Sequence, residues 1–114
     1  MRTVLVVDDE PLVLDLTATM LEDLGYQVVL STGAREALQK LRENSAIEII
    51  ITDINMPEIS GYELAHRAKR VRADLKIVFL SGREGDGHGH PLLRKPFVET
   101  DLIKVIEPDR SMTR

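Results

Sequence analysis

The side chains that could do chemistry stand where apolar stretches of the sequence end. They are Asp8 and Asp9 after residues 3–7, Asp53 after 47–52, Ser81 after 76–80, and Lys95 after 92–94. Three carboxylates that share one pocket repel one another, and at least one would take up a proton unless a cation lay among them. Oxygen ligands of this kind favour Mg²⁺ over zinc or copper. The residue types therefore indicate a magnesium site with a lysine and a hydroxyl beside it.

Asp53 is the candidate reactive group of this set. A carboxylate held between a hard cation and a lysine is equipped to attack a phosphoryl group, because phosphoryl transfer needs mainly positioning and charge neutralisation. We expect Asp53 to be the nucleophile and to form an aspartyl phosphate. Mg²⁺ and Lys95 would neutralise the phosphoryl oxygens. The Ser81 hydroxyl could donate a hydrogen bond to one of those oxygens once phosphate is bound.

These residues can meet only if a parallel sheet brings them to one edge. Five short apolar or β-branched runs predict strands at residues 3–7, 26–30, 47–52, 76–80 and 92–94. Apolar residues at helical spacing predict four clear helices, three between these strands and one after the last. Strands that alternate with helices through short connections indicate one parallel sheet with helices on both faces. In such sheets, ligands bind at the edge formed by the C-terminal ends of the strands.

The composition limits the class of protein. A chain of 114 residues fits one domain, and its net charge of −4 disfavours a face that binds nucleic acid. It contains no cysteine, which excludes disulfides and cysteine-based metal sites. No apolar run is long enough to span a bilayer and no basic leader is present, so we expect a soluble cytoplasmic protein. We assign residues 1–108 to the domain and 109–114 to a polar tail, and the short tail favours a stand-alone protein.

Residues 82–90 differ from the rest of the chain. Four of the seven glycines lie there, together with Asp86, His88 and His90, and this composition cannot make a stable helix. We expect a mobile loop. The two histidines could bind a transition metal weakly, but the sequence offers no third strong ligand, which favours a solvated loop instead. His66 lies on a predicted helix, where we expect it to be exposed.

Four short motifs, spread over nearly the whole chain, carry a resemblance to a known family. They are Val6-Val7-Asp8-Asp9-Glu10, Thr52-Asp53-Ile54-Asn55-Met56-Pro57 with Ser60-Gly61, Leu80-Ser81-Gly82, and Lys95-Pro96-Phe97. In this order they resemble the receiver domain of two-component response regulators. The resemblance implies a flavodoxin-like fold, like that of the chemotaxis regulators, with a five-stranded parallel sheet in the order 2-1-3-4-5.

The resemblance also implies a role for each motif residue. Asp53 would accept a phosphoryl group from a sensor histidine kinase or a histidine phosphotransfer protein. Asp9 would bind Mg²⁺ directly, Asp8 would bind it through water, and Asn55 would offer its backbone carbonyl. Ser81 takes the place of the switch hydroxyl, and Lys95 takes the place of the phosphate-binding lysine. The Lys95-Pro96 bond would be cis, as the matching bond is in the family.

The chain departs from the family pattern at two places. Only thirteen residues separate Ser81 from Lys95, so we expect the fourth helix of the family to be reduced or disordered. Relatives usually carry an aromatic residue three positions before the lysine, where this chain has Leu92. The usual coupling of the switch hydroxyl to that aromatic ring therefore cannot operate. We hypothesise that phosphorylation orders or shifts residues 82–90 instead.

Two other functions remain open at this point. The first is a pseudo-receiver, a binding module that works without phosphorylation, although such modules usually lose the phosphoacceptor, the acid pair or the lysine. The second is an aspartate-nucleophile phosphatase of the haloacid dehalogenase type, whose Asp-x-Asp motif is not matched by Asp8-Asp9-Glu10. We expect no metabolic enzyme: the protein would catalyse only its own phosphorylation and slow hydrolysis. Output would then pass through protein contact or phosphotransfer.

Overall fold

A five-stranded parallel sheet forms the centre of the computed structural model, which describes residues 2–82 and 86–107. The strands are β1 (Thr3–Val7), β2 (Gln27–Ser31), β3 (Ile47–Asp53), β4 (Lys76–Ser81) and β5 (Leu92–Arg94), in the spatial order β2-β1-β3-β4-β5. The helices are α1 (Pro11–Asp23), α2 (Ala34–Glu43), α3 (Gly61–Val71) and α4 (Glu99–Ile106). The predicted sheet order and the predicted number of strands are confirmed.

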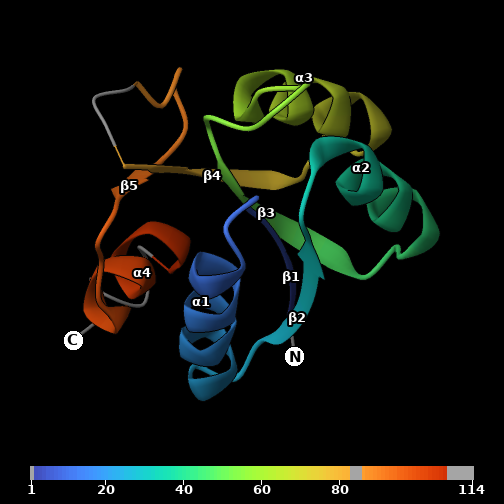
Figure 1. Ribbon diagram of the computed structural model, residues 1–114. Helices are drawn as coiled ribbons and strands as arrows, with labels where there is room; N and C mark the ends of the chain where they lie inside the picture. Colours follow the sequence, from blue (N-terminus) through green and yellow to red (C-terminus); the bar gives the residue numbers. More distant parts are fainter. Residues whose placement is uncertain (1, 83–85, 108–114) are drawn as a thin grey trace.

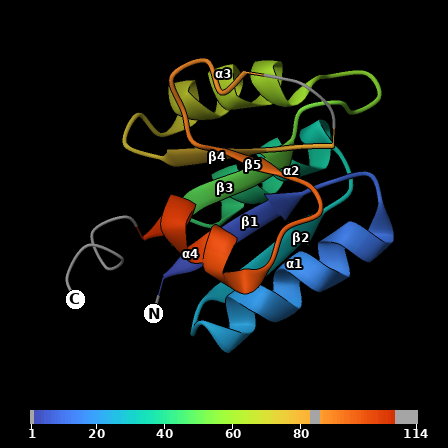
Figure 2. The same ribbon diagram turned by 90° about the vertical axis from the view of Figure 1, so that its left-hand side faces the viewer.

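Helices cover both faces of the sheet, with α1 and α4 on one face and α2 and α3 on the other (Figures 1 and 2). Because successive side chains of a strand point to opposite faces, β1 supplies both layers. Its Leu5 and Val7 pack with α2 and α3, whereas Val4 and Val6 pack with α1 and α4. All five β1 residues are buried. Burial on both faces explains why the strand reads as a continuous apolar run.

Local sequence signals set the helix boundaries nearest the strand ends. Pro11 occupies the first turn of α1, where its missing N–H costs nothing. Gly25 follows the end of α1 with φ of +94°, a left-handed conformation that suits glycine. The Ser60 hydroxyl caps α3 by accepting a hydrogen bond from the Glu63 amide at 3.2 Å. Each helix therefore begins or ends close to a strand terminus, which keeps the connections short.

No helix lies between β4 and β5 in the described residues 86–91, which form a turn instead. The predicted loss of the family's fourth helix is confirmed over these residues, while 83–85 lie outside the described part. The Phe79 amide donates to the Pro91 carbonyl at 2.9 Å, and the His90 amide donates to the Gly87 carbonyl at 2.8 Å. The described part of the predicted mobile loop is thus held by hydrogen bonds.

Two further expectations from the sequence concern the polar tail and membrane-spanning helices. The predicted tail, residues 109–114, lies outside the described residues, so its assignment stays a prediction. Within residues 2–82 and 86–107, no helix is both long enough and apolar enough to cross a membrane.

Candidate functional site

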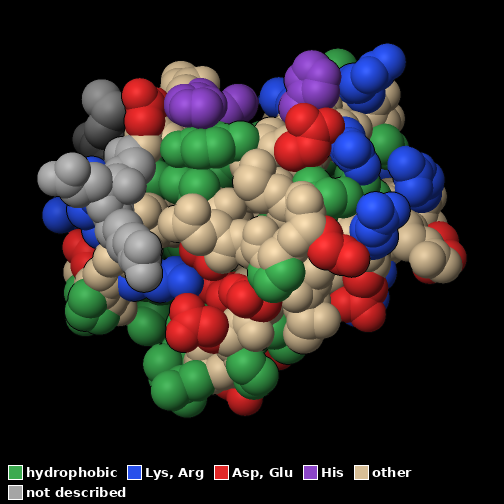
Figure 3. Space-filling model, turned by 45° about the horizontal axis from the view of Figure 1, so that its top comes forward, with side chains coloured by type: hydrophobic (Ala, Val, Ile, Leu, Met, Phe, Trp, Pro, Cys, Tyr) green, Lys and Arg blue, Asp and Glu red, His purple; other side chains and the backbone are tan. Residues whose placement is uncertain are grey.

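The polar residues that end the strands meet at one edge of the sheet, as the sequence predicts. Asp53 and Ser81 are the last residues of β3 and β4, Asp8 and Asp9 follow β1, and Lys95 follows β5. An open cavity of about 390 Å³ lies at this edge. It is lined by Asp9, Glu10, Asp53, Asn55, Gly82 and Lys95. In the space-filling view, acidic side chains gather in the lower middle of the face drawn (Figure 3).

Asp8 is a fully buried carboxylate held from two directions. Its Oδ1 accepts a hydrogen bond from the Glu10 amide at 3.0 Å, and its Oδ2 lies 2.9 Å from Lys95 Nζ. The Asp8 amide donates to the Ser31 carbonyl at 3.2 Å, which extends the pairing of β1 with β2 by one residue. The side chain is therefore fixed at the edge of the sheet and has no exposed surface.

Lys95 is the cation of the site. Its Nζ lies 2.9 Å from Asp8 Oδ2, 3.4 Å from Asp53 Oδ1 and 3.4 Å from Glu10 Oε1. Burial opposes the charged ammonium, but its hydrogen bonding with Asp8 and the charges of Asp8 and Asp53 outweigh that cost. The pKa of Lys95 is consequently raised above its ordinary value. The predicted cis Lys95-Pro96 bond is confirmed, and the Lys95 amide donates to the Ser81 carbonyl at 2.8 Å.

Asp53 is nearly buried, with 5% of its surface exposed. Burial raises the pKa of its carboxyl, and the Asp8 carboxylate raises it further, while the Lys95 charge acts in the opposite direction. The net shift is upward, so the charged form of Asp53 is disfavoured by its protein surroundings. A cation bound beside Asp53 would oppose this effect and favour the carboxylate form.

The carboxylates of Asp8, Asp9 and Asp53 fit a divalent cation. Each offers one oxygen, and the three oxygens lie within 4.8 Å of one another. Hard oxygen donors of this type suit Mg²⁺, which keeps several waters and takes few protein ligands. The exposed Asn55 lies two residues beyond Asp53 and lines the same cavity. Its backbone carbonyl as a metal ligand stays a prediction.

The start of α3 rests directly on the backbone of Asp53. The Gly61 amide donates to the Ile54 carbonyl at 2.8 Å. A Cβ atom at position 61 would lie only 2.2 Å from the Asp53 carbonyl oxygen and 2.9 Å from Ile54 Cα. Only glycine allows this approach without displacement of the backbone. In the sequence Gly61 belongs to one of the family motifs, which gave no sign of this contact.

The structure supports one predicted site residue, Ser81, only in part, and it adds Glu10 to the site. Ser81 is buried at the predicted edge, and its neighbour Gly82 lines the cavity, but the role of its hydroxyl stays a prediction. Glu10 was absent from the predicted set, although it pairs with Lys95. Its place directly after the acid pair was the available signal. The chain thus gives Lys95 three carboxylate partners.

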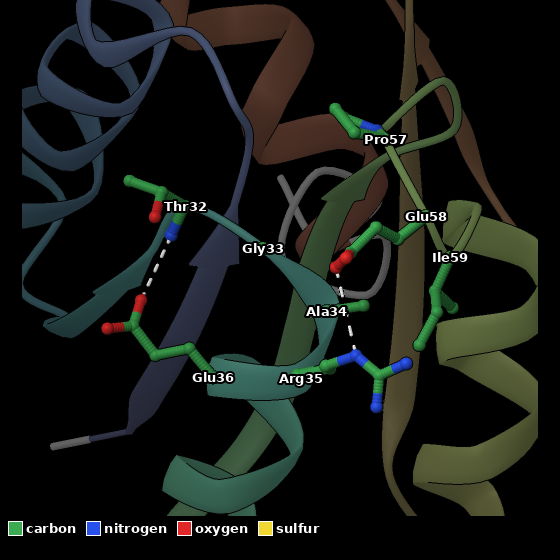
Figure 4. A pocket seen from close by; sticks show the side chains of 8 residues that line it. All are labelled: Thr32, Gly33, Ala34, Arg35, Glu36, Pro57, Glu58 and Ile59. Carbon is green, nitrogen blue, oxygen red and sulfur yellow. Dashed lines mark hydrogen bonds and ion pairs between the residues drawn. The ribbon is translucent and has the colours of Figure 1, made fainter.

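A smaller hollow of about 250 Å³ lies between the N-terminus of α2 and residues 57–59 (Figure 4). Arg35 and Glu58 form an ion pair across it, with Nε and Oε1 3.7 Å apart. The Glu36 carboxylate turns back to accept from the Thr32 amide at 3.1 Å. No residue of the predicted phosphoacceptor site lines this hollow.

Comparison with known proteins supplies an independent reading of the chain. Residues 4–107 match the family described as the response regulator receiver domain. The response regulator SaeR of Staphylococcus epidermidis is 33% identical over 111 residues, covering 90% of this chain and 48% of that protein. The chain therefore spans about half the length of the curated relatives it matches.

Solved structures agree with that reading. A receiver domain protein from Clostridium thermocellum superposes with a TM-score of 0.86 at 28% identity, covering 97% of each chain. The receiver domain of the hybrid histidine kinase CckA superposes with a TM-score of 0.79 at 32% identity, covering 90% of this chain and 93% of that one.

Proposed function

This chain belongs to the response regulator receiver domain family, and from that premise we propose that it accepts a phosphoryl group on the Asp53 carboxylate. One observation carries the proposal. The Asp53 carboxylate lies 3.4 Å from Lys95 Nζ and within 4.8 Å of the Asp8 and Asp9 carboxylate oxygens. A candidate nucleophile, an ammonium and three carboxylate oxygens thus lie close together, which supports the proposal.

The proposed reaction is an in-line phosphoryl transfer. An Asp53 carboxylate oxygen attacks phosphorus, and the bond from phosphorus to the nitrogen of a phosphohistidine donor breaks. The nitrogen keeps the electron pair of that bond. When bound, Mg²⁺ would supply positive charge against the phosphoryl oxygens. Lys95, freed from part of its pairing with the carboxylates, is placed to donate to a phosphoryl oxygen. Ser81 is our candidate for a further donor.

Water then returns the protein to its starting state by hydrolysis of the aspartyl phosphate. Both steps act on the protein itself, so we propose no turnover of an external substrate. The donor would be a sensor histidine kinase or a histidine phosphotransfer protein in the cytoplasm. Output would follow through protein contact or through phosphotransfer to another protein. The net charge of −4 gives no basis for direct binding to nucleic acid.

The two alternatives have less support. A pseudo-receiver does not need the acid pair, the lysine and the phosphoacceptor, yet Asp9, Asp53 and Lys95 line one cavity here and Asp8 pairs with Lys95. A phosphatase of the haloacid dehalogenase type would place its nucleophile after the first strand. In this chain Asp8 is buried and paired with Lys95, whereas Asp53 stands at the end of β3 and lines the cavity.

Intact-mass spectrometry after incubation with acetyl phosphate and Mg²⁺ tests the proposal. We expect one added phosphoryl group, none in the presence of a chelator, and none in Asp53→Asn. That variant keeps the size of the side chain and removes the nucleophile. Absence of an adduct with acetyl phosphate and with phosphoramidate, in protein shown to bind Mg²⁺, would contradict the proposal. Catalytic release of phosphate from a generic ester would favour the phosphatase instead.

A further inference from the structure

An aromatic contact holds the turn between β4 and β5 against α3. The turn comprises residues 86–91 and is called the His88 turn below. The ring of Tyr62, on the first turn of α3, stacks on the His88 ring with centroids 3.8 Å apart and planes 8° from parallel. The Tyr62 hydroxyl donates to the Asp86 carbonyl at 2.5 Å and lies 3.2 Å from the Asp86 amide, from which it accepts. One side chain thus contacts both the ring and the backbone of the turn.

Phe79 extends this contact into the core. Its ring meets Tyr62 edge to face, with centroids 5.1 Å apart, and meets His90 in the same manner at 5.8 Å. Phe79 is 1% exposed and lies in β4, two residues before Ser81. The histidine side chains lie along the top of the face drawn in Figure 3. The sequence suggested solvated histidines, and His88 is exposed, but the rings of His88 and His90 also contact aromatic side chains.

The backbone of the His88 turn depends on this packing. His88 has φ of +47°, a left-handed conformation that non-glycine residues adopt rarely and at some cost. Its amide donates to Asp86 Oδ1 at 2.6 Å. A Cβ atom at Gly87 would lie 2.0 Å from the His90 carbonyl, so the turn also needs glycine there. A compact conformation with such a residue persists only when its surroundings favour it, and Tyr62 provides those contacts.

The same tyrosine is linked to the phosphoacceptor through its neighbour in the chain. Gly61 rests on the Asp53 carbonyl and donates to the Ile54 carbonyl at 2.8 Å. From the other direction, Gly82 lines the phosphoacceptor cavity, and it follows β4, the strand that carries Phe79. Tyr62 therefore contacts the His88 turn. The two segments beside Tyr62, the start of α3 and the end of β4, both lie next to Asp53.

Because position 92 holds a leucine, another side chain would have to transmit a change at Asp53 to the His88 turn. Position 92 lies in β5 beside Phe79, and it holds a leucine that packs in the same core layer as Tyr62. A leucine has no ring or hydroxyl with which to report a change at the site. Among the described residues, Tyr62 is the aromatic side chain that touches both the turn and Phe79.

We propose that Tyr62 is a positioning residue that couples the state of Asp53 to the docking of the His88 turn. This inference rests on the proposed function, because it concerns the response of the same site to its phosphoryl group. A phosphoryl group on Asp53 adds oxygens to the cavity that Gly82 lines. These oxygens change the contacts that are open to the backbone at the end of β4. The start of α3 and the His88 turn then adjust together through Tyr62.

Amide hydrogen exchange of residues 86–90 tests the coupling, measured by NMR with Mg²⁺ and with or without beryllium fluoride as the phosphoryl mimic. Loading is verified separately by the fluorine signal of the bound mimic. We expect loading to change the exchange rates of the His88 turn by about fivefold or more, a factor typical of coupled sites. If the mimic binds and these rates do not change, the inference is overturned while the proposed function stands. If no mimic or phosphodonor loads Asp53, both fail.

Three variants separate coupling from a general loss of structure. Tyr62→Phe keeps the ring stack and loses both hydrogen bonds of the Tyr62 hydroxyl with the Asp86 backbone, so exchange should accelerate at least about fivefold and loading should still alter it. Tyr62→Ala should leave exchange insensitive to loading. The affinity of Tyr62→Ala for beryllium fluoride should also differ from that of the wild type. Linkage sets the size of this change: it equals the factor by which loading alters docking of the His88 turn in the wild type, and its direction must match. Tyr26→Phe is the matched control, because it also removes a tyrosine hydroxyl bond, here to Glu107 at 2.5 Å, and Tyr26 packs in the core layer on the opposite face of the sheet from Tyr62.

These variants also give results that would overturn the inference. One is a His88 turn in Tyr62→Ala that responds to loading as it does in the wild type. Another is an affinity change opposite in direction to the one that linkage demands. A third is a response in Tyr26→Phe as large as that in Tyr62→Phe, since general destabilisation would then explain both.

Discussion

Gly61→Ala should damage both the stability of the fold and the phosphorylation of Asp53. The added Cβ would lie 2.2 Å from the Asp53 carbonyl oxygen, where ordinary contacts begin near 3.4 Å. The start of α3 or the Asp53 peptide must therefore move by about 1 Å. Overpacking of this kind costs about 1–3 kcal/mol, and weakening of the bond from Gly61 to the Ile54 carbonyl adds about 1 kcal/mol. We expect a total near 3 kcal/mol.

Thermal and urea denaturation measure the first effect, for which about 3 kcal/mol corresponds to a fall in Tm on the order of 12 °C. The rate of phosphorylation by acetyl phosphate measures the second. A displacement of about 1 Å at the nucleophile can cost about a hundredfold in rate. Gly33→Ala is the control, because position 33 is extended and a Cβ added there would meet no atom within 4 Å. It should cost at most about 1 kcal/mol and leave the phosphorylation rate unchanged. Wild-type stability and rate in Gly61→Ala would refute the reasoning.

Three other predictions test separate parts of the structure. Lys95→Met keeps the aliphatic stem, and calorimetry should show that it still binds Mg²⁺. The variant should be phosphorylated at least about tenfold more slowly; an unchanged rate would contradict the role of Lys95. Arg72→Ala removes guanidinium bonds to the Ile47 and Leu41 carbonyls, at 2.7 and 2.9 Å, and should cost about 2 kcal/mol in urea denaturation without slowing phosphorylation. Burial raises the pKa of Asp53 in the folded state. Ionisation of Asp53 therefore lowers the free energy of unfolding as the pH rises from the ordinary pKa of 3.8 through the raised pKa. In chelator, Asp53→Asn should therefore exceed the wild type in stability at pH 7, and the advantage should vanish below pH 3.8; no advantage at pH 7 would contradict the shift.

The strands and their order could be predicted because the physics that fixes them is local or topological. Residues 4–7 and 49–51 are apolar throughout, which indicates strands buried on both faces, and β1 and β3 include them. Parallel strands bring their C-terminal ends to one edge. Asp8, Asp53 and Lys95 could therefore be grouped without knowledge of any distance between them.

The partners of Lys95 could not be predicted in the same way. Strand ends give the edge of the sheet, but the reach and direction of a side chain depend on the turn that follows each strand. The Asp8 side chain is oriented by the Glu10 amide, and Lys95 then lies closer to Asp8 than to Asp53. Glu10 itself completes the set of three carboxylates.

The His88 turn shows the other limit of sequence reasoning. Its glycines correctly indicated the loss of a helix over residues 86–91, but composition gave no sign of the contact with Tyr62. Tyr62 gave no signal, because an aromatic residue at the start of a helix is usually a core residue. The stack with His88 depends on the distance between α3 and the end of β4, which only the packed structure determines.

Chemical identification of the phosphorylated residue is the most direct test of the account. Borohydride reduces an aspartyl phosphate to homoserine, whereas it leaves a free aspartate unchanged. After treatment with acetyl phosphate and Mg²⁺, peptide mass spectrometry should find homoserine at position 53 and intact aspartate at Asp8 and Asp9. Homoserine at another position, or unreduced aspartate at all three in protein that carries a phosphoryl group, would contradict the assignment of Asp53 as the phosphoacceptor.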